Sequence, residues 1–494
     1  MRIRHALPLL LLASSAPALA DPGDEAATHL QRIAATDDAG PELNAVMVAK
    51  APSVLTAEVA AAANRPLAGR TVLVKDNIET REWPTTAGSL ALAGNMTGRD
   101  APLIARLRAA GGVVLGKTNL SEWANIRSGN STSGWSAVGG LTKNPHALDR
   151  NACGSSSGSG AAVAADLAWA AIGTETDGSI TCPASVNGIV GFKPTVGLVS
   201  RTHVIPISAS QDTAGPMTRS VADAALLLNA IAGPDPADPA TAEAGAHLTD
   251  FTAGLESASL TGMRIGVLRK QVGNDTRVAA LFDAALEDLK RAGAELVEID
   301  YEMPGRMGEA EFTVLLYELR RDLRAYLSGS PAEIPVRSLA DVIAFNRAHA
   351  GAEMRWFGQE LFEAAESTTD EEAYRQARAD SLRLAGTEGI DRLLAENAVA
   401  LLVAPTVGPA WSTDLVNGDH YNGSIGAGSL AAITGYPHLT VPMGAVETLP
   451  VGLSFIGPGW SDSAVLGAGA AYERARTAAL AEPSLARWEH AQHN

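Results

Sequence analysis

Short apolar runs alternate with helical segments along this chain, and this alternation restricts the fold more than any other feature. The runs Thr71–Val74, Gly112–Leu115, Leu401–Pro405 and His438–Pro442 are short and apolar and are typical of buried strands. Between the first two, residues 102–110 have helical spacing. Strands that alternate with helices form a sheet covered by helices. The sequence therefore predicts an α/β protein.

Four further stretches have helical spacing: residues 24–64, 120–126, 161–171 and about 305–397. The last one carries several aromatic residues, whose simplest role is core packing and whose alternative role is lining a substrate cleft. The strand pattern resumes after it. We therefore expect one domain, residues 21–494, into which this segment is inserted.

The charge balance limits the partners of the protein. Its 494 residues carry a net charge of −17, and 46% of them are hydrophobic. Such a chain can bury a large core, and it has no basic surface for nucleic acid or anionic lipid. We expect a small-molecule or peptide substrate without a charged polymer as partner. The sequence does not decide the oligomeric state, for which a monomer is the expectation.

The first twenty residues have the pattern of a secretory signal. Arg2 and Arg4 precede an apolar run at residues 6–13, and Ala18-Leu-Ala20 forms an A-x-A cleavage site before Asp21. The run is too short to span a bilayer. We expect a periplasmic or secreted protein, and a buried N-terminal helix is the alternative interpretation.

The chain contains two cysteines, Cys153 and Cys182. They are too few for a disulfide framework in a protein of this size. In an oxidising compartment a bridge between them is conceivable. The other interpretation is two buried thiols that pack as small apolar side chains.

Several kinds of chemistry lack their motifs. The ten histidines are scattered, with no H-E-x-x-H and no Cys/His cluster, so no metal is expected. Phosphate loops and dinucleotide fingerprints are also missing, and no cofactor is expected. The S-x-x-K pattern of serine β-lactamases does not occur.

The segment Gly154–Gly158 formally fits a G-x-S-x-G nucleophile elbow with Ser156 at its centre. Such an elbow must follow a buried strand. The preceding residues 144–153 contain proline and charges, which argue against a buried strand. The elbow therefore remains a minor alternative, with His438 as its conceivable histidine.

Lys75 follows the first apolar run directly and is a candidate base. A lysine can activate a serine hydroxyl if its ammonium is desolvated and its pKa falls from about 10.4 to roughly 7 or 8. A lysine at the end of a strand is otherwise most often solvated or ion-paired. Residues 128–160 are rich in Gly, Ser, Asn and Thr, and such a long irregular segment is typical of a functional loop.

The sequence resembles the amidase signature family along nearly its whole length after residue 20. The resemblance rests on these segments, which occur in family order: Val72-Leu-Val-Lys-Asp-Asn77, Gly116-Lys-Thr-Asn-Leu-Ser-Glu122, Cys153-Gly-Ser-Ser-Ser-Gly-Ser-Gly160, Gly173-Thr-Glu-Thr-Asp-Gly-Ser-Ile180, Asp212-Thr-Ala-Gly-Pro-Met217 and Gly435-Tyr-Pro-His-Leu-Thr-Val-Pro442. It implies a single α/β/α domain around a large, mostly parallel mixed sheet.

The resemblance also implies a Ser-Ser-Lys triad. Ser179 would be the nucleophile, Ser155 the proton relay, and Lys75 the base, with a cis peptide between Gly154 and Ser155. The substrate-binding and oxyanion residues that it implies are Gly129, Ser155, Thr176, Asp177, Gly178 and Ser179. Many family members have glycine where Asp177 stands, but a backbone donor tolerates this change.

The motifs are most similar to those of bacterial peptide amidases, which release ammonia from C-terminally amidated peptides. Family members that accept acidic substrates carry arginine just after the nucleophile, where this chain has Thr181 and Cys182. A neutral acyl group is therefore favoured. The alternatives are an aryl-acylamide, ester or carbamate hydrolase, a component of a tRNA-linked amidotransferase, which the signal sequence opposes, and a catalytically inactive ligand-binding protein.

Overall fold

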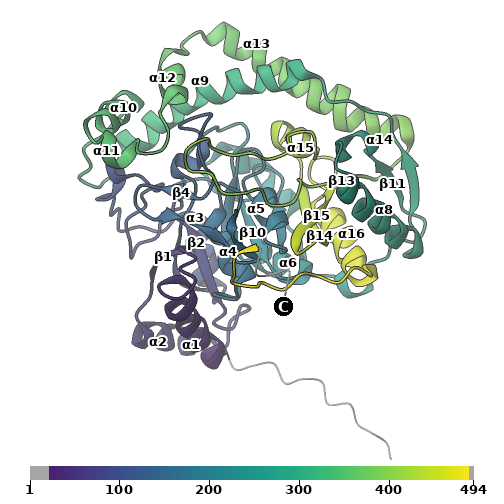
Figure 1. Cartoon of the computed structure of the whole chain (residues 1–494), viewed down its shortest axis with the longest axis horizontal. Coiled ribbons are helices and arrows are strands. Elements are labelled where there is room, and N and C mark those ends of the chain that lie inside the picture. The colour runs from purple at the N-terminus through teal and green to yellow at the C-terminus, as the bar shows by residue number, and fades with distance from the viewer. Residues whose placement is uncertain (1–21, 489–494) are drawn as a thin grey trace, which may run out of the picture.

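A computed structural model describes residues 22–488, which are built around one eleven-stranded sheet (Figure 1). The expected signal peptide, residues 1–20, lies outside the described residues. From one edge to the other the strands are β1 (Val46–Ala49), β3 (Val113–Thr118), β2 (Thr71–Lys75), β8 (Ala170–Glu175), β10 (Thr213–Thr218), β9 (Val190–Lys193), β14 (His438–Val446), β15 (Leu449–Ile456), β13 (Leu401–Pro405), β11 (Arg264–Val267) and β12 (Glu295–Glu298).

The sheet is mixed, but the expectation that it is mostly parallel is wrong. β2 runs parallel to β3 and β8, and β11 runs parallel to β12 and β13. All other neighbours in this sheet are antiparallel. The middle of the sheet differs because β14 and β15 are joined by a tight turn, and a short connection forces an antiparallel hairpin.

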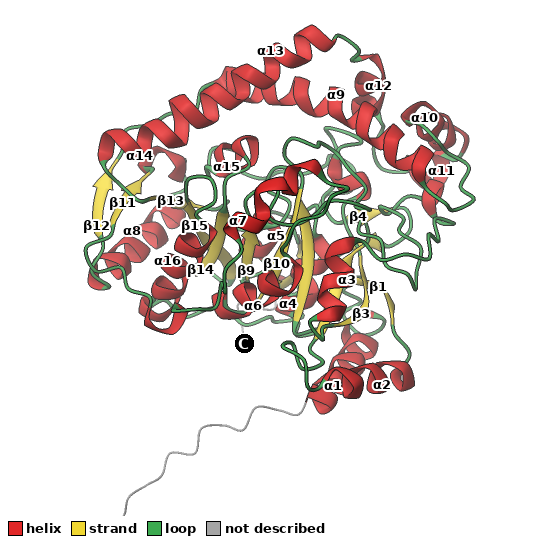
Figure 2. Cartoon of the chain, turned by 180° about the vertical axis from the view of Figure 1, so that it is seen from behind, coloured by secondary structure: helices red, strands yellow, loops and turns green. Residues whose placement is uncertain are grey.

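Helices cover both faces of the sheet, as Figures 1 and 2 show, so the α/β/α architecture is confirmed. One face shares its apolar core with α3 (Pro102–Ala109), α6 (Val221–Ile231), α8 (Thr276–Arg291) and α16 (Asp462–Ala475). A second core contains residues of α1 (Pro22–Arg32), α2 (Pro52–Ala62), α4 (Ser157–Ala164) and α5 (Thr181–Val186). The remaining helices before and after the insertion are α7 (Ala244–His247) and α15 (Gly428–Thr434).

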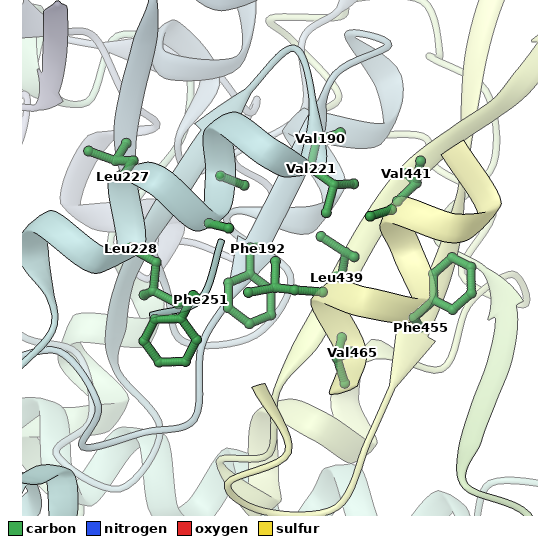
Figure 3. Packing of buried hydrophobic residues seen from close by; sticks show 14 of the residues in the cluster. Val190, Phe192, Val221, Leu227, Leu228, Phe251, Leu439, Val441, Phe455 and Val465 are labelled. Atoms are coloured by element: carbon green, nitrogen blue, oxygen red, sulfur yellow. The ribbon is translucent and has the colours of Figure 1, made fainter. Parts of the chain in front are cut away.

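Side-chain alternation in the middle strands gives the sheet one apolar and one polar face. Phe192 of β9 and Leu439 and Val441 of β14 point into the first core (Figure 3). Successive side chains of a strand point to opposite faces. Lys193 and His438, which are paired in register, therefore lie on the other face. This face carries the candidate site.

Three segments differ from the secondary structure that the sequence predicts. The helix expected at residues 161–171 is α4, which ends at Ala164, and β8 begins at Ala170. An alanine-rich run suits either structure, and pairing with β2 and β10 makes its second half a strand. The edge strand β1 lies inside residues 24–64. The expected helix at 120–126 is a short 3₁₀ segment.

The irregular segment 128–160 contains two small hairpins outside the main sheet. They pair β4 (Trp135–Ser136) with β5 (Gly140–Leu141) and β6 (Lys143–Asn144) with β7 (Ala147–Asn151).

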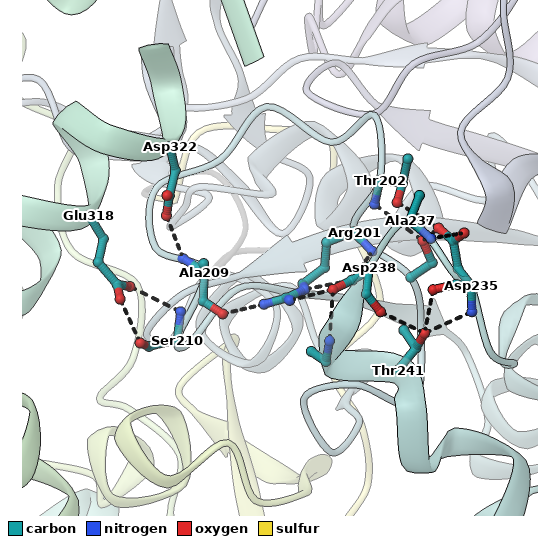
Figure 4. A network of polar contacts seen from close by, with 12 residues as sticks. Arg201, Thr202, Ala209, Ser210, Asp235, Ala237, Asp238, Thr241, Glu318 and Asp322 are labelled. Carbon is teal, nitrogen blue, oxygen red and sulfur yellow. Dashed lines mark hydrogen bonds and ion pairs between the residues drawn. The ribbon is translucent and has the colours of Figure 1, made fainter. Parts of the chain in front are cut away.

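The helical insertion forms an arch over one end of the sheet (Figures 1 and 2). Its helices are α9 (Gly305–Gly329), α10 (Leu339–Ala348), α11 (Ala350–Glu353), α12 (Glu360–Ser367), α13 (Glu371–Leu382) and α14 (Asp391–Asn397), which confirms the helical prediction for about 305–397. A polar network anchors α9 to the segment before β10 (Figure 4). In it Glu318 accepts hydrogen bonds from Ser210, and Asp322 accepts one from the N–H group of Ala209. Within residues 22–488, no helix combines the length and the apolar character needed to cross a bilayer.

Candidate active site

Lys75, the last residue of β2, is fully buried. Its Nζ lies 2.7 Å from Oγ of Ser155, and it also donates to Oγ1 of Thr174 at 2.8 Å and to the Thr174 carbonyl at 3.1 Å. Burial lowers the pKa of Lys75 to about 7, although the negative charges of Asp212 and Glu175 act in the opposite direction. The amine can therefore be neutral near physiological pH.

Ser155 is also fully buried and follows a cis peptide bond from Gly154, as the resemblance implied. Its carbonyl accepts the N–H group of Ser121 at 3.0 Å. A Cβ atom at Gly154 would lie 2.1 Å from Oγ of Ser121, so only glycine fits there. The loop that carries Ser155 is thus held tightly against the segment after β3.

The backbone of Ser179 lies beside this loop. The N–H group of Ser156 donates to the Ser179 carbonyl at 3.1 Å, which brings together two segments that the sequence predicted to share one cleft. Ser179 is 9% exposed. Among the described residues, its hydroxyl makes no recorded hydrogen bond to another protein group, so the oxygen is free to meet a substrate.

The turn before Ser179 presents unused backbone donors. Within the described part of the chain, the N–H groups of residues 176–179 have no recorded protein acceptor, whereas the next two, of Ile180 and Thr181, donate to Oε2 of Glu175 at 2.7 and 2.9 Å. Gly178 has φ +81°, a left-handed conformation that favours glycine. Such a turn is suited to hold an oxyanion.

The side chain of Thr176 fixes one end of this turn. Its hydroxyl donates to Oδ1 of Asp212 at 2.6 Å, and Nε2 of Gln211 donates to its carbonyl at 3.3 Å. The other carboxylate oxygen of Asp212 accepts the N–H groups of Ile207 and Ser208. The segment before β10 therefore positions the turn.

Cys153 and Cys182 form a disulfide, with Cα atoms 6.0 Å apart. Of the two interpretations of these cysteines, the bridge is the one that the structure has. It joins the residue two positions before Ser155 to the helix that begins just after Ser179. The bridge therefore links the loops of both candidate serines covalently.

Gly129 does not offer its N–H group to a substrate. That group donates to Oε1 of Glu360 at 2.7 Å, and the Ser128 hydroxyl donates to the same oxygen. As an oxyanion donor Gly129 is therefore a wrong prediction, because the insertion already occupies its N–H group. Contact between the rest of Gly129 and a substrate stays a prediction.

Ser156, the centre of the alternative elbow, is buried and occupied. Its hydroxyl donates to the Thr174 carbonyl at 3.1 Å and accepts from the Thr174 N–H group at 3.2 Å. A short strand, β7, does precede this loop, contrary to expectation, but it belongs to a separate two-stranded sheet. Nε2 of His438 contacts Oγ of Ser454 at 2.7 Å instead. This geometry does not support the elbow.

A pocket of about 290 Å³ opens in front of the nucleophile turn. Its wall includes Gly178, the disulfide, Asp177, Asp419 and His438. Asp419 was not predicted as a site residue, because it lies in an irregular stretch with no motif, and His438 was expected to be a packing residue. The described residues hold no group of His, Cys, Asp and Glu side chains placed to bind a metal.

Comparisons with known proteins agree with this geometry. The amidase family model matches residues 27–466. A probable amidase of Arabidopsis thaliana is 40% identical over 420 residues, which are 83% of this chain and 77% of that protein. The GatA-type chain of the glutamyl-tRNA(Gln) amidotransferase of Salinispora arenicola is 37% identical over 480 residues, which are 90% of this chain and 92% of that one.

The native peptide amidase of Stenotrophomonas maltophilia is similar in structure as well as in sequence. It superposes with a TM-score of 0.88 at 48% identity, and the match covers 94% of this chain and 96% of that one. The chain therefore belongs to the amidase signature family and is an amide-hydrolysing enzyme.

Proposed function

We propose that this protein is an exported serine amidase that releases ammonia from C-terminally amidated peptides. Ser179 is the nucleophile, Ser155 the proton relay and Lys75 the base. The observation that carries the proposal is the 2.7 Å contact between Nζ of Lys75 and Oγ of Ser155 in a fully buried site, where the pKa of the amine falls to about 7. A desolvated amine beside a serine can replace the histidine of other serine hydrolases.

The cycle begins with neutral Lys75. It accepts the hydroxyl proton of Ser155, which takes the proton of Ser179 as the latter attacks the amide carbonyl. Ser155 then passes a proton to the departing nitrogen, and ammonia leaves. Water attacks the acyl-enzyme by the same proton path and releases the carboxylic acid.

The turn at residues 176–179 stabilises the tetrahedral intermediate. Its free N–H groups receive the negative charge that develops on the carbonyl oxygen. Removal of one such donor typically costs about 3 to 4 kcal/mol of transition-state stabilisation.

The likeness to the S. maltophilia peptide amidase favours a peptide amide as the substrate. The same triad would also serve an aryl-acylamide, ester or carbamate hydrolase. The identity to amidotransferase chains supports a second possibility, the transfer of ammonia to an acceptor held by partner proteins. Free ammonia release by the chain alone separates hydrolysis from this transfer.

The test is ammonia release from a short C-terminally amidated peptide, measured beside an anilide of the same acyl group. The wild type should release ammonia and cleave the anilide slowly. Ser179→Ala should lose at least about 10⁴-fold in kcat. More than trace activity in pure Ser179→Ala would overturn the triad, and preferential cleavage of the anilide would move the assignment to an acylamidase.

Export is part of the proposal. The pattern of residues 1–20 supports it, and so does the disulfide, because such bonds persist in oxidising compartments. N-terminal sequencing of protein from the periplasmic or culture fraction should give Asp21 as the first residue. An intact N-terminus on cytoplasmic protein would overturn export.

A further inference from the structure

Asp177 projects from the nucleophile turn into the pocket, and its carboxylate is held by two groups. Its Oδ2 accepts the Ser429 hydroxyl at 2.7 Å, and its carboxyl group shares a hydrogen bond with Glu311 of α9. The side chain stays partly open on the pocket side. Asp177 is thus fixed in place while it faces the space that a substrate would enter.

The surroundings decide which of the two carboxyls carries the proton. Glu311 is 7% exposed, and its Oε1 accepts from Nε2 of Gln211 at 2.8 Å, so Oε2 remains to hold a proton. Burial raises the pKa of Glu311 well above its ordinary value. Loss of solvent contact raises the pKa of Asp177 to about 6. At neutral pH Glu311 is therefore the neutral donor and Asp177 the anion.

The rest of the pocket adds hydrogen-bond acceptors and no cation. Asp419 lies in its wall, where it accepts from Nε1 of Trp411 at 3.2 Å and from the Ser133 hydroxyl at 2.6 Å. Burial lowers the pKa of His438 to about 3, so its ring is neutral. Its Nδ1 is fully buried and has no partner among the described residues. No lysine or arginine lines the pocket within residues 22–488.

Two further charged groups act on Asp177 from the sheet below. Glu175 carries a like charge, and Lys193 carries the opposite charge. Lys193 is fully buried, and its Nζ donates to the Pro194 carbonyl at 3.3 Å, so it is not offered to the pocket. A charged substrate group would therefore meet Asp177 and Asp419 directly and the cation only through protein.

We propose that Asp177 is a specificity-determining residue that makes the enzyme prefer amides whose acyl part carries a positive charge and disfavour those that carry a carboxylate. The inference rests on the proposed function, since it assigns the charge preference of the same cleft. It goes beyond the neutral acyl group that the sequence favours. The carboxylate product of hydrolysis would also be repelled, which favours its release.

The test compares three amidated peptides that differ only in a C-terminal lysine, norleucine or glutamate. For the wild type, kcat/KM should be at least about tenfold higher for lysine than for glutamate, with norleucine between them. Asp177→Asn should shrink the lysine-to-glutamate ratio about tenfold. Glu311→Gln, which mimics a protonated glutamate, should keep the ratio. Asp300→Asn, which removes an exposed charge paired with Lys270, is the matched control.

The ratio also depends on pH in the wild type. It should fall as the pH drops below about 6, where Asp177 becomes protonated, and this measurement serves even if Asp177→Asn does not fold. A ratio that is near one in the wild type, or unchanged in an active Asp177→Asn, would overturn the charge preference. Failure of the wild type to release ammonia from the norleucine peptide would instead overturn the proposed function itself.

Discussion

Nζ of Lys75 and Oγ of Ser155 lie 2.7 Å apart although 80 positions separate them in the chain. One residue ends a central strand, and the other lies in the irregular loop that precedes α4. Because both are fully buried, the proton that they exchange is shielded from solvent. Their contact makes the protonation state of one amine the condition for turnover.

Activity should therefore follow the ionisation of Lys75. A base works only when it is neutral, and below a pKa of about 7 the neutral fraction falls about tenfold per pH unit. With an uncharged substrate, kcat/KM should rise with pH through about 7 and then level off. An acid limb that extends to about pH 10 would contradict this prediction, since Lys75 would then have an ordinary pKa.

Two adjacent serines should differ sharply when each is replaced by alanine. Ser155→Ala removes the proton relay and should lower kcat by at least about 10³-fold. Ser156→Ala removes two hydrogen bonds with the backbone of Thr174 and should cost about 1 to 3 kcal/mol of stability while keeping most activity. Ammonia release and urea unfolding measure the two effects. A dead Ser156→Ala with native stability would restore the elbow interpretation.

Reduction of the disulfide should lower both stability and activity. The bridge closes a loop of 29 positions, and loss of such a crosslink costs about 3 to 4 kcal/mol in the chain-entropy model. It also frees the loops of Ser155 and Ser179 from one another. Dithiothreitol should lower Tm and kcat of the wild type, whereas Cys153→Ala/Cys182→Ala should not respond to it. Equal responses of both proteins would show that the reductant acts elsewhere.

Much of the site could be predicted because its residues lie in short continuous motifs at the ends of strands. Lys75 and Ser179 were found in this way, and the strand Leu401–Pro405 matched β13 residue for residue. Strand direction could not be predicted, because apolar runs do not reveal their pairing partner. Glu311 and Glu360 were missed because their role arises only when the insertion folds back over the loops. The occupied N–H group of Gly129 has the same origin.

The insertion is held to the site by a buried charge cluster, which should contribute strongly to stability. The side chain of Arg127 is fully buried, lies 2.8 Å from Oε1 of Glu122 and 3.7 Å from Oε2 of Glu353, and stacks 4.3 Å from the ring centre of Phe357. Glu353 in turn accepts the N–H group of Leu90 at 2.6 Å. Loss of the arginine would leave two buried carboxyls without their counterion.

Arg127→Met should therefore lower the free energy of unfolding by about 3 to 5 kcal/mol. Arg347→Met, which removes an exposed arginine paired with Glu363, is the control and should cost at most about 1 kcal/mol. Burial already raises the pKa of Glu122 despite the arginine. Without the arginine its carboxyl would be protonated at acidic pH and charged only at an unfavourable cost above it. The loss, measured by urea unfolding, should thus be larger at about pH 8 than at about pH 5. Equal losses in the two variants would show that the cluster does not hold the insertion.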